Sequence, residues 1–338
     1  MRYKTLLITC ISALALSGCG SVAERFDQKP KEIIETNLLS GRVGTNGPVL
    51  VVKVDDTNLA HPQIGLEDAD VVYIEQVEGG LTRLAVIYSS KIPTEIGPVR
   101  SARISDIDIL SQYGHIAFAY SGAQKKLLPV IAAANLQNLG AQSQSSTIYT
   151  RDPSRVSPYS MVMRADLLMA KIIEKGYHID SAKSVGWSFG DAPTTGQEIT
   201  SVSLHWPATS YRADWSSTSQ CWSLFHNSKP DYVQTGKQLC ASTLVIQNVS
   251  ITNSEYHDKV GGITPFSNTV GSGTGFILRD GKSFAGTWTR ASAIEGTTWT
   301  DMDGKPILFA PGQVWVALLQ SAPEFEQVTP SANPSPTK

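Results

Sequence analysis

The chain has 338 residues, of which 41% are hydrophobic and 17% are charged, and its formal net charge is −2 at pH 7. This length suggests two domains, and this composition supports a sizeable core and excludes wholesale disorder. The small net charge argues against a nucleic-acid-binding protein, and the absence of runs of like charge excludes a polybasic membrane patch.

The N-terminus has the features of an export signal. A basic start precedes a short apolar run, 6–16, which ends in Leu-Ser-Gly-Cys at 16–19. Such a pattern is typical of a secretory signal peptide, and the run is too short to span a bilayer. The Leu-Ser-Gly-Cys ending resembles the bacterial lipobox, which implies cleavage before Cys19 and lipid attachment to its thiol. We therefore expect residues 1–18 to be a lipoprotein signal peptide and the mature protein to be lipid-anchored at the extracytoplasmic face of the cell membrane.

Changes in composition divide the rest of the chain into five parts, and together these parts predict an α+β fold. The last stretch is rich in Pro, Ser and Thr, which is typical of disorder, and Gly, Ser, Asp, Pro and Thr also concentrate just after residue 186. The expected parts are a tether at 19–47, an N-terminal α/β sheet domain at 48–186, a linker at 187–199, an antiparallel β-rich C-terminal domain at 200–322 and a disordered tail at 323–338.

The N-terminal domain is expected to alternate strands and helices. Apolar, β-branched runs predict buried strands at 49–54, 70–77 and 81–89, with a further strand at 115–120. Apolar residues at helical spacing predict helices at 101–113, 123–134 and 160–175. Pro129 argues against an unbroken second helix, and Gly176 is a suitable C-cap for the third.

The C-terminal domain is expected to be antiparallel and partly closed into a barrel. Its apolar runs are short and alternating, and Asp280-Gly281 and Asp303-Gly304 lie between such runs as tight hairpin turns. Cys221 and Cys240 are the two cysteines that remain beside the signal and Cys19. An exported compartment permits disulfides, so we expect a bridge between them across one hairpin; the alternative is two buried free thiols.

A candidate anion site follows the third predicted strand. Arg100, Ser101 and Arg103 come directly after Gly97-Pro98 and open a predicted helix. Helix N-termini carry unpaired N–H groups and partial positive charge, and two arginines there suit a phosphate or carboxylate. The alternative is that both arginines pair with acidic side chains inside the fold.

Acidic and basic side chains at other strand ends are further candidates. Glu78 and Arg83 flank a Gly79-Gly80 turn, which a simple hairpin also explains. Asp55 ends the first strand beside a second aspartate, and such a pair can bind a cation or act as acid and base. Acidic turn residues are common, however. Arg151 and Asp152 lie in a loop before the third helix, where a salt-bridged loop is the simpler interpretation.

Other kinds of site receive little support from the sequence. The six histidines are isolated, and no pair has the i, i+4 spacing of a helical zinc site. No G-x-S-x-G elbow and no P-loop motif is present. We therefore expect no metal and no cofactor.

The motifs VEGG-x-TR and GPVRSAR, together with VGSGTGFILRDGKSFAGTWTR in the second half, resemble the YerB-like lipoproteins of mainly Gram-positive bacteria. That family is a domain-of-unknown-function family with N- and C-terminal halves, and the resemblance covers about 48–319. It implies an envelope lipoprotein and supplies no activity. The matching positions include Asp55, Gln63, Glu78, Arg83, Arg100, Ser101, Arg103, Arg151 and Asp152. Where the resemblance leads us to expect Pro-His-Asn, this chain has Pro158-Tyr159-Ser160, which disfavours a histidine-dependent enzyme.

These observations lead to one main hypothesis and two alternatives. The main hypothesis is an anchored binding protein for an anionic cell-envelope polymer or fragment, bound by Arg83, Arg100, Ser101, Arg103, Arg151 and Asp152. The first alternative is a cell-wall hydrolase or transferase with Asp55 or Glu78 as acid or base. The second is a scaffold for envelope proteins that uses the Trp-rich β domain.

Overall fold

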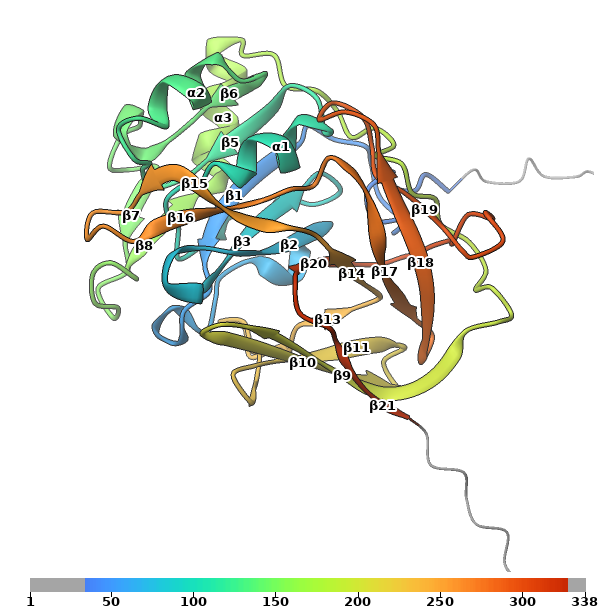
Figure 1. Cartoon of the computed structure of the whole chain (residues 1–338). Coiled ribbons are helices and arrows are strands. Elements are labelled where there is room, and N and C mark those ends of the chain that lie inside the picture. Colours follow the sequence, from blue (N-terminus) through green and yellow to red (C-terminus); the bar gives the residue numbers. More distant parts are fainter. Residues whose placement is uncertain (1–33, 328–338) are drawn as a thin grey trace, which may run out of the picture. The chain divides into compact units, whose positions relative to one another are not determined.

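The N-terminal half alternates short strands and helices (Figure 1). We analysed a computed structural model, which describes residues 34–327. The strands of this half are β1 (Leu50–Asp55), β2 (Val71–Gln76), β3 (Thr82–Tyr88), β4 (Glu95–Ile96), β5 (Ile116–Ala119), β6 (Leu136–Asn138), β7 (Tyr149–Arg151) and β8 (Met161–Arg164). The helices are α1 (Ser105–Ser111), α2 (Leu128–Ala133) and α3 (Ala165–Lys175), with 3-10 turns η1 (Asn58–Ala60), η2 (Leu66–Asp68), η3 (Glu78–Gly80) and η4 (Ala141–Ser143).

The C-terminal half is built from strands. They are β9 (Gln197–Trp206), β10 (Thr209–Ser216), β11 (Cys221–His226), β12 (Lys229–Pro230), β13 (Cys240–Ala241), β14 (Thr243–Asn248), β15 (Ile251–His257), β16 (Ile263–Ser267), β17 (Gly271–Arg279), β18 (Lys282–Arg290), β19 (Thr298–Thr300), β20 (Val314–Leu319) and β21 (Glu324–Gln327). Asp280 and Gly281, at φ 50° and 70°, turn the β17–β18 hairpin, which is the conformation that an Asp-Gly pair favours. The predicted α+β fold is confirmed.

The predicted helices form, but they are shorter than expected. α1 starts at Ser105 because the preceding residues complete the sheet: Arg100 N–H donates to the Lys53 carbonyl at 2.8 Å. Pro129 lies in the first turn of α2, where a backbone N–H has no hydrogen-bond partner within the helix, so the proline removes no helical hydrogen bond. α3 begins only at Ala165 because the residues before it form β8, and Gly176 ends it at φ 64°.

One mixed sheet of 16 strands joins the two halves of the chain. Its main path is β12-β11-β10-β9-β18-β17-β14-β20-β2-β3-β1-β5-β6. β20 pairs in parallel with β14 on one side and with β2 on the other, so a strand near the C-terminus lies beside the N-terminal strands. The path has two ends, β12 and β6, so in the described part of the chain this sheet does not form a fully closed barrel.

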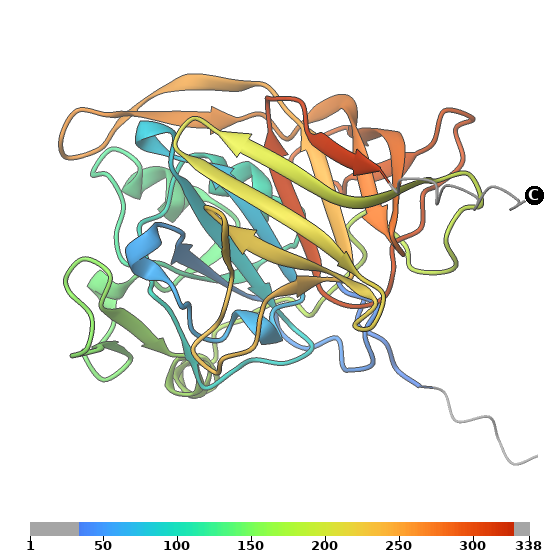
Figure 2. The same cartoon turned by 90° about the horizontal axis from the view of Figure 1, so that it is seen from below.

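Strand alternation divides the core into two faces. On β1, Leu50, Val52 and Val54 pack into one cluster, and Val49 and Val51 belong to the other. The first cluster is covered by the β9–β10–β11 layer, which crosses beneath the N-terminal strands (Figures 1 and 2). The second cluster includes residues of α1. The centre of the sheet is therefore buried on both faces.

Three predicted boundaries need correction. Part of the expected tether is folded: Asn37 and Leu39 are buried, and the Asn37 side chain donates to the Ser89 hydroxyl at 3.3 Å. In the expected linker, Trp187 is buried and stacks on Phe309, with ring centroids 5.2 Å apart. At the start of the expected tail, β21 pairs with β9. Local composition missed these segments because their partners lie far away in the sequence.

Some expectations concern residues that the structure does not describe. Cys19, the signal peptide and the end of the tail lie outside residues 34–327. Among the residues it does describe, no helix is long and apolar enough to cross a membrane.

The predicted disulfide is present between Cys221 on β11 and Cys240 on β13, two strands that pair directly. Replacing both cysteines with serine is expected to lower the free energy of unfolding by about 3 kcal/mol, because the bond restricts an unfolded loop with a sequence separation of 19. Urea denaturation of the wild type and the double variant measures the difference. Reduced wild type should match the variant, and an unchanged midpoint in both would contradict the prediction.

Candidate functional site

The end of β1 places two consecutive acidic side chains on opposite faces of the sheet. Asp55 lies directly opposite Arg83 of β3 and forms an ion pair with Arg100. Asp56 faces the other way, where it accepts hydrogen bonds from Thr82 and from Tyr211 Oη at 2.6 Å. Both aspartates are almost completely buried. Each therefore organises a separate polar cluster.

On the Asp55 side, the sheet borders a basic cavity of about 690 Å³, which we call the arginine cavity. Six lysines and arginines line it against two acids, Glu78 and Asp258. The cationic side chains are Arg83, Arg100, Arg103, Lys125, Lys126 and Lys259, and the lining also includes Ser101, Pro158, Tyr256 and Thr264. The local charge therefore favours an anionic guest.

The arginines of the cavity differ in how far the protein neutralises them. Arg103 binds Glu78 through two nitrogens, with Nε 2.7 Å from Oε1 and Nη2 2.7 Å from Oε2. Arg100 pairs with Asp55 and lies over the Tyr159 ring, 5.8 Å from its centroid, which is within cation–π distance.

Arg83 has no such neutralising partner. Its guanidinium donates to the Ser101 carbonyl at 3.2 Å, and within residues 34–327 no carboxylate oxygen lies within 4.0 Å of it. The side chain is only 9% exposed. Burial lowers the pKa of Arg83, and Arg103 and Arg100 lower it further, whereas the charges of Asp55 and Glu78 raise it; the result is a pKa of about 9. A buried cation among like charges is costly unless a counterion joins it.

The backbone adds little to anion binding, contrary to our expectation. Arg100 to Arg103 precede α1 rather than forming its first turn. Ala102 N–H donates to the Gly122 carbonyl at 2.9 Å, and Arg103 N–H donates to Asp106 Oδ2 at 2.7 Å. These two N–H groups are therefore not available to an anion in the cavity.

The two candidate catalytic carboxylates are poorly placed for proton transfer. Burial raises the pKa of Glu78, but the hydrogen bonds and charge of Arg103 and the hydroxyl of Thr264 lower it more, so that the pKa lies below its ordinary value. Asp55 has no exposed surface and is not part of the cavity lining. Glu78 is therefore not a suitable general acid near neutral pH, and a substrate in the cavity does not reach Asp55.

A buried ionic triad lies next to the cavity. Lys53 pairs with Glu75 and, at 2.7 Å, with Asp106, and all three side chains are fully buried. Burial and the neighbouring Asp106 raise the pKa of Glu75 to about 7 against the effect of Lys53. Asp106 also receives the Arg103 N–H. The triad therefore helps to fix the arginine-bearing segment and does not line the cavity.

The structure brings together only part of the predicted binding set. Arg83, Arg100, Ser101 and Arg103 meet in the arginine cavity, whereas Arg151 and Asp152 are not in its lining. Asp152 pairs with Arg155, and Arg151 donates to Ser160 at 3.1 Å. Their loop contributes Pro158 to the lining, and Tyr159 of the same loop lies against the Arg100 guanidinium. Their role in ligand binding stays a prediction.

Sequence analysis missed the lysines of the cavity. Lys125 and Lys126 precede α2, and Lys259 follows β15. The Lys125-Lys126 pair was a visible signal, but nothing in the sequence places Lys259 near Arg100. Lys259 lies in the turn between β15 and β16, and this pair of strands packs near η3 and α1.

On the Asp56 side, residues from both halves of the chain form a histidine cluster of Asp56, His61, His226 and Asp231. His61 Nδ1 donates to Asp231 Oδ1 at 2.9 Å, and His61 Nε2 lies 3.5 Å from Asp56 Oδ1. His226 Nε2 lies 3.9 Å from Asp56 Oδ2, and the two imidazoles stack at 4.2 Å. Burial lowers the pKa of His61, but Asp231 and Asp56 raise it more, to about 10. No sequence motif indicated this cluster, since His61 and Asp231 are 170 residues apart.

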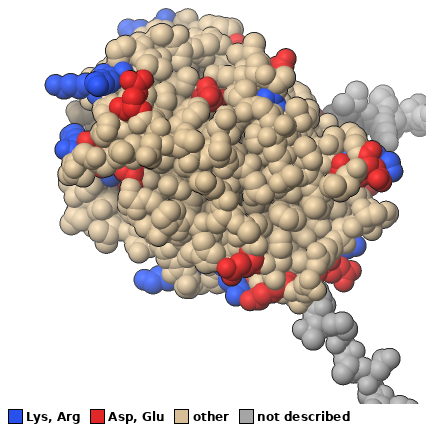
Figure 3. Space-filling view, in the orientation of Figure 1, with Lys and Arg blue, Asp and Glu red and all other residues tan. Residues whose placement is uncertain are grey.

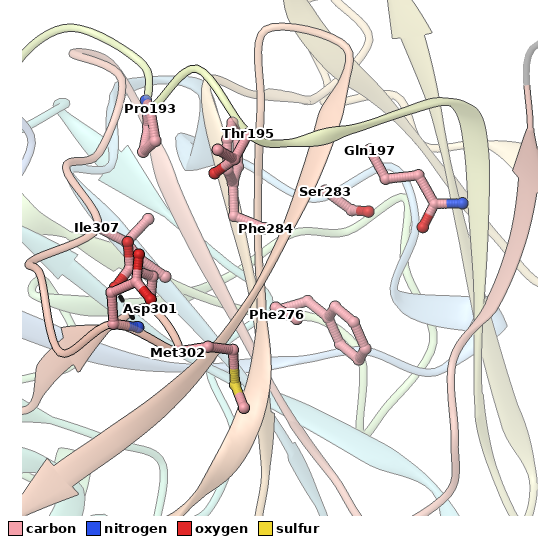
Figure 4. Close-up of a pocket in the computed structure, with 11 residues that line it drawn as sticks. Pro193, Thr195, Gln197, Phe276, Ser283, Phe284, Asp301, Met302 and Ile307 are labelled. Carbon is pink, nitrogen blue, oxygen red and sulfur yellow. Dashed lines mark hydrogen bonds between the residues drawn. The ribbon is translucent and has the colours of Figure 1, made fainter.

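A third cavity, of about 340 Å³, lies among Phe276, Phe284, Met302 and Ile307 (Figure 4). Two acids line it, Asp301 and Asp303, and Asp301 accepts hydrogen bonds within its own turn from the N–H groups of Asp303 and Lys305 at 2.9 Å. It therefore brings together fewer reactive groups than the other two sites.

The surface gives little support to a Trp-based docking site. Five tryptophans of the C-terminal half are buried core residues, namely Trp206, Trp222, Trp288, Trp299 and Trp315. Figure 3 shows one face of the molecule, on which most charged side chains lie toward the edges of the view. This face has no broad patch of a single charge.

Glu78→Gln is expected to destabilise the protein at neutral pH. It is also expected to reduce the loss of unfolding free energy that the wild type shows as pH falls. Because the folded-state pKa of Glu78 is lowered, its stabilising contribution is present above the ordinary glutamate value of about 4.3 and is lost as pH falls below that value. Denaturant melts between pH 3 and 7 measure both effects. A constant difference between the two proteins over this range would contradict the assignment.

Comparison with known proteins agrees with the sequence resemblance. Residues 36–178 match the domain model "Protein of unknown function (DUF3048) N-terminal domain", and residues 202–316 match the corresponding C-terminal domain model. The Bacillus subtilis (strain 168) protein named "Putative lipoprotein YerB" is 25% identical over 284 residues, which are 82% of each chain.

The crystal structure of YerB from Bacillus subtilis is similar in fold. It aligns with a TM-score of 0.74 and 19% identity, over 87% of this chain and 100% of that one. The two domain models together cover most of the chain, and they occur in the order found in the family. The chain therefore belongs to the two-part, YerB-like family of proteins of unknown function.

Proposed function

We propose that this protein is a lipid-anchored, extracytoplasmic lipoprotein that binds an anionic cell-envelope component in the arginine cavity. The observation that carries the proposal is Arg83, a buried guanidinium beside Arg100 and Arg103 with no carboxylate partner in the described chain. A phosphate or carboxylate of a ligand would supply the missing counterion. The lipobox-like sequence at 16–19 and the name of the relative YerB support the anchoring.

The size and chemistry of the cavity favour a polymer fragment over a simple ion. Its volume of about 690 Å³ lies in the range of ligand pockets. Lys125, Lys126 and Lys259 add charge away from the three arginines, so that several anionic groups of one ligand can be bound at once. Phosphate-bearing polymer fragments and peptidoglycan fragments have this property.

Binding accounts for the geometry better than catalysis does. A cell-wall enzyme of the kind considered from the sequence needs one carboxylate whose pKa is raised and which reaches the substrate. Glu78 faces the cavity with a lowered pKa, and Glu75, whose pKa is raised, is fully buried away from it. The enzyme alternative therefore gains no support from these groups.

Arg83→Met is expected to weaken ligand binding by about 10- to 100-fold, because a charge-assisted hydrogen bond contributes roughly 1.5–3 kcal/mol. The substitution should not lower the stability of the ligand-free protein, because it removes a desolvated positive charge that lies close to Arg100 and Arg103. Calorimetric titration with glycerol-phosphate oligomers and with muropeptides measures affinity, and thermal melts measure stability.

The matched control is Arg212→Met. Arg212 also lies on a strand, but it is exposed and pairs with Asp214 and Glu326. This variant should bind like the wild type, and a neutral chito-oligosaccharide should not bind either protein. Equal affinities of the Arg83 variant and the wild type, or an absence of binding by every anionic probe, would refute the binding proposal.

The anchoring is tested separately through Cys19. Cells that express the protein and are fed an alkyne analogue of palmitate should yield labelled protein in the membrane fraction. Cys19→Ala should be unlabelled and should leave that fraction, whereas the Cys221→Ser, Cys240→Ser protein should still be labelled. A Cys19→Ala protein that remains labelled and membrane-bound would exclude lipid attachment at this cysteine.

A further inference from the structure

We infer that the histidine cluster is a binding site for a divalent transition-metal ion such as Zn²⁺, with Asp56, His61 and His226 as ligands. These residues come from η1 and its flanks in one half of the chain and from β11 in the other. One ligand atom from each lies within 4.8 Å of the other two. The site is on the opposite face of the sheet from the arginine cavity and is independent of the proposed anion binding.

The distances suit an ion of this class. Zinc binds nitrogen and carboxylate oxygen at about 2.0–2.2 Å, which places two donors on one ion roughly 3.3–3.6 Å apart. His61 Nε2 is 3.5 Å from Asp56 Oδ1, and His226 Nε2 is 3.9 Å from Asp56 Oδ2. Because the two imidazoles stack at 4.2 Å, binding one ion requires the rings to turn until both Nε2 lone pairs point to it. Imidazole nitrogen with a single carboxylate favours zinc and its neighbours over magnesium or calcium.

His61 also has the outer contact that metal-binding histidines need. Its Nδ1 donates to Asp231 Oδ1 at 2.9 Å, so Nε2 is the atom that faces Asp56 and His226, and a bound ion would displace the proton that Nε2 carries in the protonated ring. Such carboxylate–histidine pairs fix the ring orientation at metal centres. Asp231 is 1% exposed, and its second oxygen has no hydrogen-bond partner within residues 34–327. A divalent ion would balance the charge of Asp56 and Asp231.

Gln63 supplies an independent indication. Its side chain is fully buried, and its amide nitrogen lies 3.4 Å from both Asp56 Oδ1 and His61 Nε2. The amide oxygen has no partner in the described structure. A half-turn of the amide would direct this unpartnered oxygen to the ion as a further ligand and would give up the hydrogen bond from the amide nitrogen to the Asp55 carbonyl at 3.2 Å.

The site is also accessible. His61 and His226 line a cavity of about 340 Å³ together with Pro62 and Tyr232. An ion can therefore enter from solvent, and a water molecule or a ligand group can complete its coordination. Sites with three protein ligands and one open position are typical of reactive rather than purely structural zinc.

The test uses the full-length protein after treatment with EDTA. Calorimetric titration with Zn²⁺ should show one equivalent bound, and the melting temperature should rise with Zn²⁺ because the ion binds the folded state. Mg²⁺ and Ca²⁺ should have neither effect. His226→Gln should weaken Zn²⁺ binding by roughly 100-fold or more, since loss of even an outer partner costs about 10- to 100-fold.

The matched control is His178→Gln, which alters a similar but exposed surface pair. His178 Nε2 lies 2.8 Å from Asp180 Oδ1, and its ring stacks on His115 at 6.2 Å. This variant should keep the full affinity for Zn²⁺. Loss of binding in the His178 variant with retention in the His226 variant, or no Zn²⁺ binding by the wild type, would overturn the inference.

A spectroscopic measurement keeps the test decisive if His226→Gln does not fold. X-ray absorption of the His178→Gln protein with one equivalent of Zn²⁺ should show two imidazole ligands with additional oxygen ligands. A spectrum that fits oxygen ligands alone would reject the assignment. Because Arg83→Met leaves these residues unchanged, its zinc affinity should equal that of the wild type, so the two sites are tested separately.

Discussion

The structure depends on how two adjacent, almost fully buried charges at the end of β1 are compensated. Ionised carboxylates are very unfavourable in a protein interior unless they are paired and hydrogen-bonded. Strand alternation directs Asp55 and Asp56 to opposite faces, so one set of partners cannot satisfy both. Asp55 forms an ion pair with Arg100, whereas Asp56 accepts a hydrogen bond from Tyr211, which belongs to the other half of the chain. Polar residues on both faces of the sheet therefore interact with the same end of β1.

The two faces differ in how complete that compensation is. On the Asp56 side, hydroxyl, amide and imidazole groups all approach the carboxylate. On the Asp55 side, three guanidinium groups face two carboxylates, and within residues 34–327 Arg83 is the group that forms no ion pair. An uncompensated buried charge destabilises the fold, and such sites are retained where function requires them. This imbalance is the physical basis of the proposed anion binding.

Local sequence signals predicted the parts of the fold that depend on short segments. β1, β2 and β3 were evident because both of their faces are buried, which produces continuous apolar runs, and the Asp280-Gly281 turn was evident from its residues. The position of β20 between β2 and β14 was not evident from the sequence. Its apolar sequence fits any central strand, and only the assembled sheet shows which edge it joins.

The same distinction applies to the two sites. Arg83, Arg100 and Arg103 were found because they lie in compact motifs within 21 residues of one another along the chain. The histidine cluster was not found, since His61 and His226 meet only when the β9–β10–β11 layer folds over β1. The expectation that the histidines are isolated holds for the sequence but not in space.

Tyr159 shows how this chain differs from the pattern that the resemblance suggested. The ring lies near the Arg100 guanidinium, beside Pro158 in the cavity lining. A histidine in that position could exchange a proton near neutral pH, and this chain has no imidazole at position 159. An aromatic face can still orient a guanidinium through cation–π attraction. In this protein the loop is therefore better suited to holding a cation for recognition than to moving a proton.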